Sequence, residues 1–223
     1  MFTEAISAPL LKLLQRLNSI PDMASCYLGG GTALAIQLGH RKSEDLDFFL
    51  PEGLAPLSIA KGLQEGAGDI LVLNQTRGHT ELLIQGIKLD LIEARISLRF
   101  PLKPIHPQTL DLKMADARDI GRMKLFAIGS RGSKKDFVDL FCLTKDITDL
   151  ESLIAIAESE HKGLKYSKLL FLKGLVDFQE ADQEPDPIMI WHNTWDEIKE
   201  SLKDEVRRIA HKIQTGHLVP RSS

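Results

Sequence analysis

The chain has 223 residues, of which 43% are hydrophobic and 26% are charged. These proportions are typical of soluble globular proteins and exclude the disordered and fibrous classes. The formal net charge of -3 gives no strong overall field toward nucleic acid or an anionic membrane, although it leaves room for a local basic patch. The length allows one large domain or a catalytic domain with a helical appendage, and we favour the second arrangement.

The cysteines and the chain ends suggest a cellular location. Cys26 and Cys142 stand far apart, each among apolar residues, which predicts buried thiols of a cytosolic protein rather than a disulfide or a metal site. The N-terminal segment lacks the features of a secretory signal, and no apolar run is long enough to span a bilayer. We therefore predict a cytoplasmic location and no membrane partner. Residues 216–223, GHLVPRSS, resemble a purification-tag remnant and are excluded from the fold prediction.

The first half of the chain alternates between helical and strand patterns. Leu10, Leu14 and Leu17 recur at helical spacing, which predicts an amphipathic helix that ends before Pro21. Short apolar runs bounded by turn residues predict strands, and the last two strands form a hairpin about Gly86. The predicted strands cover residues 24–28, 45–50, 69–73, 80–85 and 87–94, and two further helices cover residues 32–38 and 56–65.

A change of pattern divides the chain. Residues 101–107 contain three prolines and no periodicity, which predicts a boundary between a sheet-containing half and a helical half. Helical apolar spacing follows over residues 116–128, 135–144, 150–160, 164–178 and 195–213. The predicted fold class is α/β: residues 1–105 form a core with a small mixed sheet flanked by helices, and residues 106–215 form a C-terminal helical bundle that completes a cleft.

A glycine-rich turn lies between the first predicted strand and the next helix. Residues 29–31 are all glycine and precede Thr32. Glycines here let backbone N–H groups approach phosphate oxygens at the positive end of the helix, and Thr32 would add a hydroxyl contact. Taken alone, the turn is better explained as a plain structural connector.

A pair of carboxylates favours the phosphate interpretation. Asp45 and Asp47 lie two residues apart on a predicted strand and point the same way, which costs stability unless a cation lies between them. Asp90, in the middle of an apolar strand, also needs a partner or an ion. Hard oxygen ligands suit Mg²⁺, which takes its other ligands from water and triphosphate. The alternative is a solvated strand face, but the apolar residues after Asp47 indicate burial.

Two sequence blocks together resemble a known family. The first is GGTAL followed by HRKSEDLDFF, and the second is DIGRMKLFA, then Arg131, then KKDFVDL. These blocks resemble the abortive-infection nucleotidyltransferases, which include AbiE-type toxins of bacterial toxin–antitoxin pairs. The broader superfamily contains DNA polymerase beta and the aminoglycoside nucleotidyltransferases. With Asp90, the resemblance covers residues 28–140.

The resemblance implies roles for individual residues. Gly30 and Gly31 begin the phosphate loop, and Arg41 belongs to the family's pattern. Asp45, Asp47 and Asp90 are implied to be metal ligands and catalytic residues, with Mg²⁺ or Mn²⁺ as cofactor and a nucleoside triphosphate (NTP) as substrate.

The second block implies further contacts to the nucleotide. Lys124, also a catalytic candidate, and Arg131 contact its phosphates, while Asp136 or Asp139 completes the pocket. Without the resemblance, Lys124 and Arg131 would be read as a solvated helix face, and Asp136 as a residue that favours the start of its helix.

The resulting hypothesis is transfer of a nucleoside monophosphate from an NTP to an acceptor. By analogy with the family, the acceptor is tRNA or a protein, and a cognate antitoxin opposes the resulting toxicity. One alternative is a small-molecule nucleotidyltransferase of the antibiotic-modifying kind, and another is a non-catalytic interaction module. A basic rim at the cleft would favour RNA; it would comprise Arg41, Lys42, Arg122, Lys134 and Lys135.

Overall fold

The computed structural model describes residues 2–64, 70–94, 97–105, 110–160 and 168–215. The chain divides into two compact units, one formed by Met1–Ile120 and Ile188–Trp191, the other by Gly121–Pro187 and His192–Ser223. This division falls later than residue 105, because the last strand and the first turn of the following helix belong to the first unit. The tag-like residues 216–223 lie outside the described residues.

The first unit is built on a mixed sheet, which confirms the predicted fold class. Seven strands in the described residues form it, in the order β3-β4-β5-β2-β1-β7-β6. The β2/β5 and β1/β7 pairs are parallel, and the other pairs are antiparallel. The strands are β1 (Tyr27–Leu28), β2 (Leu46–Leu50), β3 (Ile70–Gln75), β4 (His79–Ile84), β5 (Ile87–Glu93), β6 (Lys103–Pro104) and β7 (Lys113–Met114).

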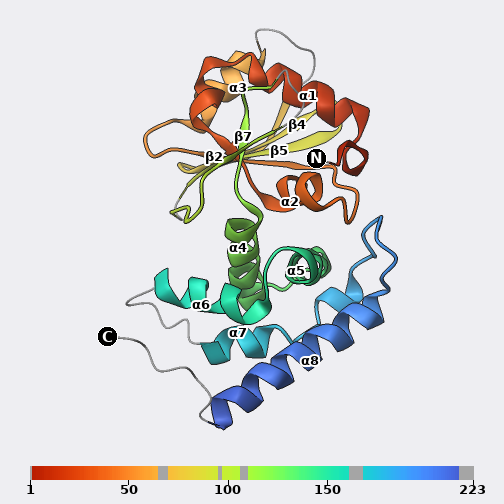
Figure 1. Ribbon diagram of the computed structural model, residues 1–223. Coiled ribbons are helices and arrows are strands. Elements are labelled where there is room, and N and C mark those ends of the chain that lie inside the picture. Colours follow the sequence, from red (N-terminus) through yellow and green to blue (C-terminus); the bar gives the residue numbers. More distant parts are fainter. Residues whose placement is uncertain (1, 65–69, 95–96, 106–109, 161–167, 216–223) are drawn as a thin grey trace. The chain divides into compact units, whose positions relative to one another are not determined.

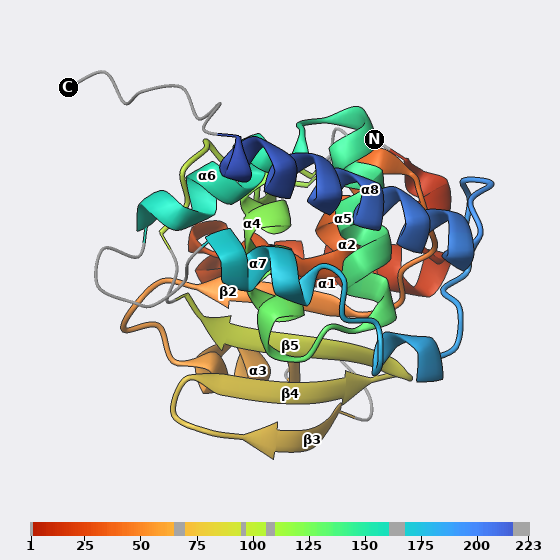
Figure 2. The same ribbon diagram turned by 90° about the horizontal axis from the view of Figure 1, so that it is seen from below.

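Helices α1 (Ala8–Asn18) and α3 (Pro56–Gln64) cover one side of this sheet (Figure 1). The unit's other helical segments are η1 (Thr3–Ala5), η2 (Pro21–Ser25) and α2 (Gly30–Leu38). Figures 1 and 2 show α1 and α3 on the same side of the sheet. Ser7 caps α1 by accepting a hydrogen bond from the Leu10 amide, and the leucines of α1 that recur at helical spacing are buried. Apolar periodicity in the sequence therefore predicted both the helix and the face that it buries.

The central strand has two chemically different faces. In β2, Leu46, Phe48 and Leu50 are fully buried, while Asp47 and Phe49 between them are half-buried. Successive side chains of a strand point to opposite faces. One face of β2 therefore packs in the core, and the other presents Asp47 at a partly open surface.

The hairpin β4–β5 turns through two residues in the left-handed region. Gln85 has φ 52° and Gly86 has φ 81°, the combination that a two-residue turn between twisted strands requires. The hairpin predicted about Gly86 is thereby confirmed. Its second strand, β5, carries Asp90 in parallel register with β2.

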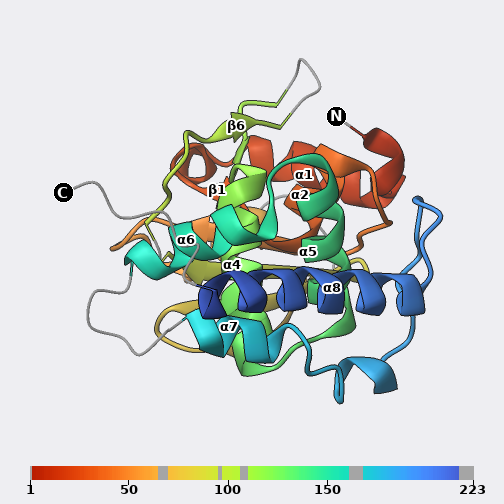
Figure 3. The same ribbon diagram turned by 60° about the horizontal axis from the view of Figure 1, so that its bottom comes forward.

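The second unit is helical, as predicted. Its elements are the remainder of α4 (Ala117–Ser130), α5 (Lys134–Asp146), α6 (Leu150–Glu160), α7 (Lys168–Gly174), η3 (Ala181–Gln183) and α8 (Trp195–Gln214). Figure 3 shows α8 running along this unit beside α5 and α7. A capping box of Thr194 and Glu197 starts α8, and the rings of Phe137, Phe178 and Trp195 pack together at centroid distances of 4.9 to 6.0 Å.

Several elements differ from the sequence prediction. The first strand, predicted over residues 24–28, covers only Tyr27–Leu28, because Pro21–Ser25 form the short helix η2. Helix α2 begins at Gly30 rather than Thr32, so the glycines form its first turn. Strands β6 and β7 were not predicted, because two residues are too short for a recognisable alternation. The described helix α7 ends at Gly174, short of the predicted residue 178, because the backbone there leaves the helix through turns closed by the Val176 and Asp177 amides.

Both cysteines are buried free thiols, as predicted. Burial raises the pKa of Cys26 to about 11, so its thiol stays protonated and unreactive at neutral pH. Within the described residues, every helix is too short or too polar to cross a bilayer.

Asp116 supplies a testable link between pH and stability in the first unit. Its buried carboxylate accepts hydrogen bonds from the Arg118 backbone at 2.9 Å and the Arg118 Nε at 2.8 Å, and pairs with Lys103 at 3.1 Å. Burial alone would raise the pKa of Asp116, but these donors outweigh burial and lower the pKa to about 2.

Because this pKa lies below that of an unfolded aspartate, the stabilisation is present above about pH 4 and is lost as the pH falls toward 2. We expect Asp116→Asn to lower the free energy of unfolding by roughly 2 kcal/mol at pH 7, with the deficit shrinking between pH 5 and pH 2. Urea denaturation followed by circular dichroism measures this. Asp111→Asn, at an exposed position of the same unit, is the matched control, and a deficit that does not depend on pH would contradict the assignment.

Candidate active site

The glycine turn lies directly against Asp47. The Gly29 amide donates a 2.8 Å hydrogen bond to the Asp47 carbonyl. Gly30 has φ +60°, and a Cβ atom there would lie 1.9 Å from Asp47 Oδ2. Two features therefore require glycine at this position: the left-handed backbone conformation and the close approach of the Asp47 carboxylate. The first turn of α2, whose amides have no partner within the helix, thus lies beside the acidic side chain.

Thr32 and Arg41 hold the segment that leads into β2. The buried Thr32 hydroxyl donates to the Asp45 carbonyl and shares a 2.7 Å hydrogen bond with the Ser43 hydroxyl. Arg41 is 2% exposed, and its Nη1 donates to the Lys42 carbonyl at 2.9 Å. Both residues therefore shape the loop before the carboxylates. Their predicted contacts with nucleotide, and that of Gly31, remain predictions.

Three carboxylates stand in one row across three neighbouring strands. Asp47 of β2 lies directly opposite Asp90 of β5, and Asp90 lies directly opposite Glu81 of β4. Asp45 immediately precedes β2 and is half-buried. Opposed residues on neighbouring strands bring their side chains together, so this row concentrates negative charge on the open face of the sheet.

Asp90 has a different nitrogen partner at each oxygen. His79 Nε2 lies 2.5 Å from Oδ1, and Lys88 Nζ lies 3.2 Å from Oδ2. Lys88 also pairs with Glu81 at 3.0 Å. The hydrogen bond to Glu81 raises the pKa of Lys88 above its ordinary value, with burial opposing and Asp90 reinforcing the rise. Lys88 therefore stays cationic at neutral pH and offsets the repulsion between two opposed carboxylates.

The donor set fits a hard divalent cation only in part. Within the described residues, no three His, Cys, Asp or Glu side chains are arranged to hold a metal ion. Asp47 and Asp90 nevertheless provide neighbouring carboxylates, the ligand type that Mg²⁺ takes in small number alongside water and substrate phosphate. Asp47 and Asp90, with Asp45 two residues before Asp47, therefore fit such a site only if water and a triphosphate supply the other ligands. Their role as ligands remains a prediction.

The second unit contains its own lysine between two carboxylates. Lys124 Nζ of α4 lies 2.7 Å from Asp136 and 2.8 Å from Asp139, both on α5 and both buried. Burial would lower the pKa of Lys124, but Asp139 and Asp136 outweigh it and raise the pKa. The three residues that the sequence predicted to share a pocket are therefore brought together, as a buried ion cluster rather than a solvated helix face.

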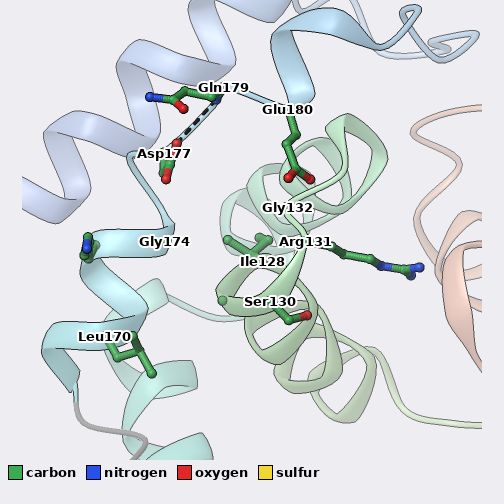
Figure 4. Close-up of a pocket in the computed structure, with 11 residues that line it drawn as sticks. Ile128, Ser130, Arg131, Gly132, Leu170, Gly174, Asp177, Gln179 and Glu180 are labelled. Atoms are coloured by element: carbon green, nitrogen blue, oxygen red, sulfur yellow. Dashed lines mark hydrogen bonds between the residues drawn. The ribbon is translucent and has the colours of Figure 1, made fainter.

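Arg131 is exposed, just beyond the end of α4. It borders a cavity of about 250 Å³ whose lining includes Gly129, Gly132, Gly174 and Asp177. Figure 4 shows the Arg131 side chain pointing away from the other labelled lining residues. Its predicted phosphate contact also remains a prediction.

The predicted basic rim does not form as a surface feature. Arg41, Arg122 and Lys134 are only 2%, 0% and 5% exposed. Lys134 pairs with Asp186 at 2.9 Å and donates its backbone N–H to Glu184. Only Lys42 and Lys135 of the five cations are exposed. The condition that would have favoured RNA as acceptor is therefore not met by these residues.

Comparison with known proteins identifies the family. The sequence profile of the nucleotidyl transferase AbiEii toxins, of type IV toxin–antitoxin systems, matches residues 12–215. The chain belongs to this AbiEii family. It is a nucleotidyltransferase, as the sequence blocks predicted.

Individual relatives agree with this assignment. An uncharacterised protein of Aquifex aeolicus (strain VF5) is 33% identical over 202 residues, which cover 87% of this chain and 92% of that protein. The nucleotidyltransferase toxin MenT4 of Mycobacterium tuberculosis H37Rv has a similar fold, with a TM-score of 0.59, 16% identity, and 88% of this chain and 82% of that chain covered.

A smaller enzyme shares part of the fold. The antibiotic-resistance factor ANT(2'')-Ia, solved in complex with adenylyl-2''-tobramycin, has a TM-score of 0.55 and 15% identity. The match covers 69% of this chain and 99% of that one. Together these likenesses support the mixed-sheet nucleotidyltransferase fold of this AbiEii-family chain.

Sequence reasoning missed His79, Glu81 and Lys88. His79 and Glu81 lie two residues apart on β4, and Lys88 and Asp90 lie two residues apart on β5. Because successive side chains of a strand point to opposite faces, each pair lies on one face. The missing information was the register between the strands, which sets Glu81 opposite Asp90. The available signal was a pair of ionisable side chains, two residues apart, on each side of the turn predicted at Gly86.

Substitution of Gly30 tests the contact between the turn and Asp47. We expect Gly30→Ala to lose about 1–2 kcal/mol to left-handed backbone strain and further stability from the clash with Asp47 Oδ2. Gly53→Ala is the matched control, since Gly53 has φ +87° but nothing within 4 Å of the added Cβ. Urea denaturation compares the two variants. Equal losses would show that Asp47 is not held against the turn in solution.

Removal of Lys124 tests the buried ion cluster of this AbiEii-family chain. Lys124→Met leaves two buried carboxylates without their shared cation, so we expect the free energy of unfolding to fall by about 3–5 kcal/mol. Lys199 also bridges two carboxylates, Asp182 and Asp196, but on the surface, so Lys199→Met should change stability little. Both are measured by urea denaturation at pH 7. A small effect of Lys124→Met would mean that water or a rearranged neighbour replaces the ammonium group.

Proposed function

We propose that this chain transfers a nucleoside monophosphate from an NTP to an acceptor oxygen, with Mg²⁺ or Mn²⁺ held by Asp45, Asp47 and Asp90. The observation that carries the proposal is the adjacency of Asp47 and Asp90 in register, beside the glycine turn that opens α2. Family membership makes this chain a nucleotidyltransferase, and the carboxylate row is where the first unit concentrates oxygen ligands.

The residues of the first unit would have different roles in the transfer. The backbone amides of Gly30 and Gly31, at the start of α2, would bind phosphate oxygens, and Asp45 and Asp47 would carry the cation. When bound, a divalent cation offsets the charge of the triphosphate and stabilises the departing pyrophosphate. Asp90 would orient the acceptor hydroxyl and accept its proton. A bond forms between the acceptor oxygen and the α-phosphorus as the bond to pyrophosphate breaks.

The residues of the second unit would bind the nucleotide rather than react. Lys124 would offer a point charge to phosphate while Asp136 and Asp139 fix its position. The two carboxylates would accept two of the three N–H donors of the ammonium group, which leaves one for a phosphate oxygen, and Lys124 would lose little further freedom on binding. Arg131, which is exposed, would supply a fork of donors to the same anion.

The acceptor and the biological role are inferred from the family assignment. We propose that the chain acts as the toxin of a type IV pair, with a cognate antitoxin as its partner, because its family is described in those terms. Of the two acceptors expected from the family, we favour a protein over tRNA. The burial of Arg41, Arg122 and Lys134 removes three of the five cations that the predicted rim would have offered to an RNA backbone.

A small-molecule acceptor is the second candidate. ANT(2'')-Ia, whose structure contains an adenylylated aminoglycoside, shares the fold over 69% of this chain. The scarcity of exposed cations among the rim residues is equally compatible with such an acceptor. Incubation with labelled nucleotide and separate pools of tRNA, protein and aminoglycosides distinguishes the acceptors.

Thermal stability with each NTP tests the proposed function first. Ligand that binds the native state must raise the melting temperature, so we expect one NTP to raise it in the presence of Mg²⁺. Asp45→Asn/Asp47→Asn should abolish this rise. The control Asp196→Asn/Asp204→Asn removes the same charge from exposed positions of α8 and should retain it.

Transfer is then followed with that NTP labelled at its α-phosphate, because the label moves to the acceptor only if pyrophosphate leaves. Absence of a metal-dependent rise with every NTP at millimolar concentration would refute the proposed binding site. A rise without label transfer to any pool would support the non-catalytic module instead.

A further inference from the structure

We propose that Lys88 is a resident counter-cation of the metal site, which leaves Asp90 when a divalent cation binds and is then held by Glu81. This inference rests on the proposed function, since it assumes that Asp90 binds the metal. It assigns a role to Lys88 and Glu81, two residues of neighbouring strands that form an exchange device for the carboxylate row.

Each carboxylate oxygen of Asp90 already has a partner, with which a metal ion would compete. His79 lies 2.5 Å from Oδ1 and Lys88 lies 3.2 Å from Oδ2. The Asp90 side chain is only 8% exposed, whereas that of Lys88 is 41% exposed. Lys88 is therefore the partner that can move, because its long side chain extends toward solvent. Its departure would free Oδ2 while His79 still fixes the orientation of the carboxylate.

Glu81 is a second ion-pair partner for the ammonium group of Lys88. It lies 3.0 Å from Lys88 Nζ, closer than Asp90 does, and its side chain is 23% exposed. Lys88 needs only to pivot about Glu81 to leave Asp90, and it keeps one ion pair throughout. Without Glu81, Lys88 would have Asp90 as its only carboxylate among these contacts and would compete more strongly with a metal.

Repulsion between neighbouring carboxylates explains why a lysine that can change partner is present here. Asp47, Asp90 and Glu81 stand opposite one another on three strands, and like charges directly opposite destabilise a sheet. The ammonium group of Lys88 reduces that repulsion in the metal-free protein. A bound divalent cation replaces this compensation for Asp47 and Asp90, and Lys88 continues to neutralise Glu81.

Binding of Mn²⁺, measured from the paramagnetic resonance signal of the free ion, tests the exchange without reference to activity. It is measured with and without the NTP that gives the largest thermal shift. Lys88→Met removes the competitor, so we expect about threefold tighter binding, the scale of a partly exposed ion pair. Glu81→Gln should weaken binding by a similar factor, and Lys88→Arg should stay close to wild type. Lys113→Met, which removes an exposed charge of the same unit, is the matched control.

The double variant separates exchange from a general effect of charge. If Glu81 acts by holding Lys88, Glu81→Gln has no effect once Lys88 is methionine, and the double variant binds Mn²⁺ as tightly as Lys88→Met. If both residues act only through their field, the two effects add. Additive effects, or a Lys88→Met variant that binds no more tightly than wild type, would overturn the inference. Circular dichroism melting establishes that each variant is folded.

Asp90→Asn distinguishes failure of this inference from failure of the proposed function. If wild type binds no Mn²⁺ under either condition, or if Asp90→Asn binds as well as wild type, the proposed metal site itself is wrong. If Asp90→Asn abolishes binding but Lys88→Met leaves it unchanged, the metal site stands and the exchange by Lys88 is refuted.

Discussion

The parallel register between β2 and β5 is the constraint on which the candidate site depends. It sets Asp47 directly opposite Asp90 on the face of the sheet that is not fully buried. A slip of one residue would turn the side chains of β5 over, so that Asp90 entered the core and Leu89 or Leu91, both fully buried, came out. The apolar faces of the two strands therefore fix the register, and the register creates the acidic pair. Packing energy in the core maintains an arrangement of like charges that would not form alone.

Each unit contains a lysine that pairs with two neighbouring carboxylates, but the two lysine side chains differ in how exposed they are. Lys124 is 12% exposed between Asp136 and Asp139, of which Asp139 is fully buried. Loss of such a partner leaves a buried charge without compensation, which costs several kcal/mol, so Lys124 is held in place. Lys88 is 41% exposed between Asp90 and Glu81, where an ion pair contributes little. The first arrangement suits a cation that stays in place, and the second suits a cation that is replaced.

The sequence predicted the elements of the fold better than the relations between them. Leucine spacing predicted α1, alternation predicted β2, and Gly86 marked the β4–β5 turn, because each pattern reflects the burial of one local face. It did not predict β6 and β7, which are only two residues long. For the site, Asp47 and Asp90 were identified because acids in apolar strands need a partner. Glu81 and Lys88 were not, because their role depends on which residues of β4 and β5 face each other, and several registers satisfy the same alternation.

The distribution of cations bears on how an acceptor is recognised. Arg41 is bonded to its own loop, Arg122 is fully buried, and Lys134 is held by Asp186 and the segment around Glu184. These cations stabilise the fold and are not available to neutralise a polyanion at the surface. Affinity for RNA comes largely from such neutralisation, so these three residues would add little to it. The fold itself does not decide the acceptor, because the choice of acceptor depends on the surfaces around the carboxylate row.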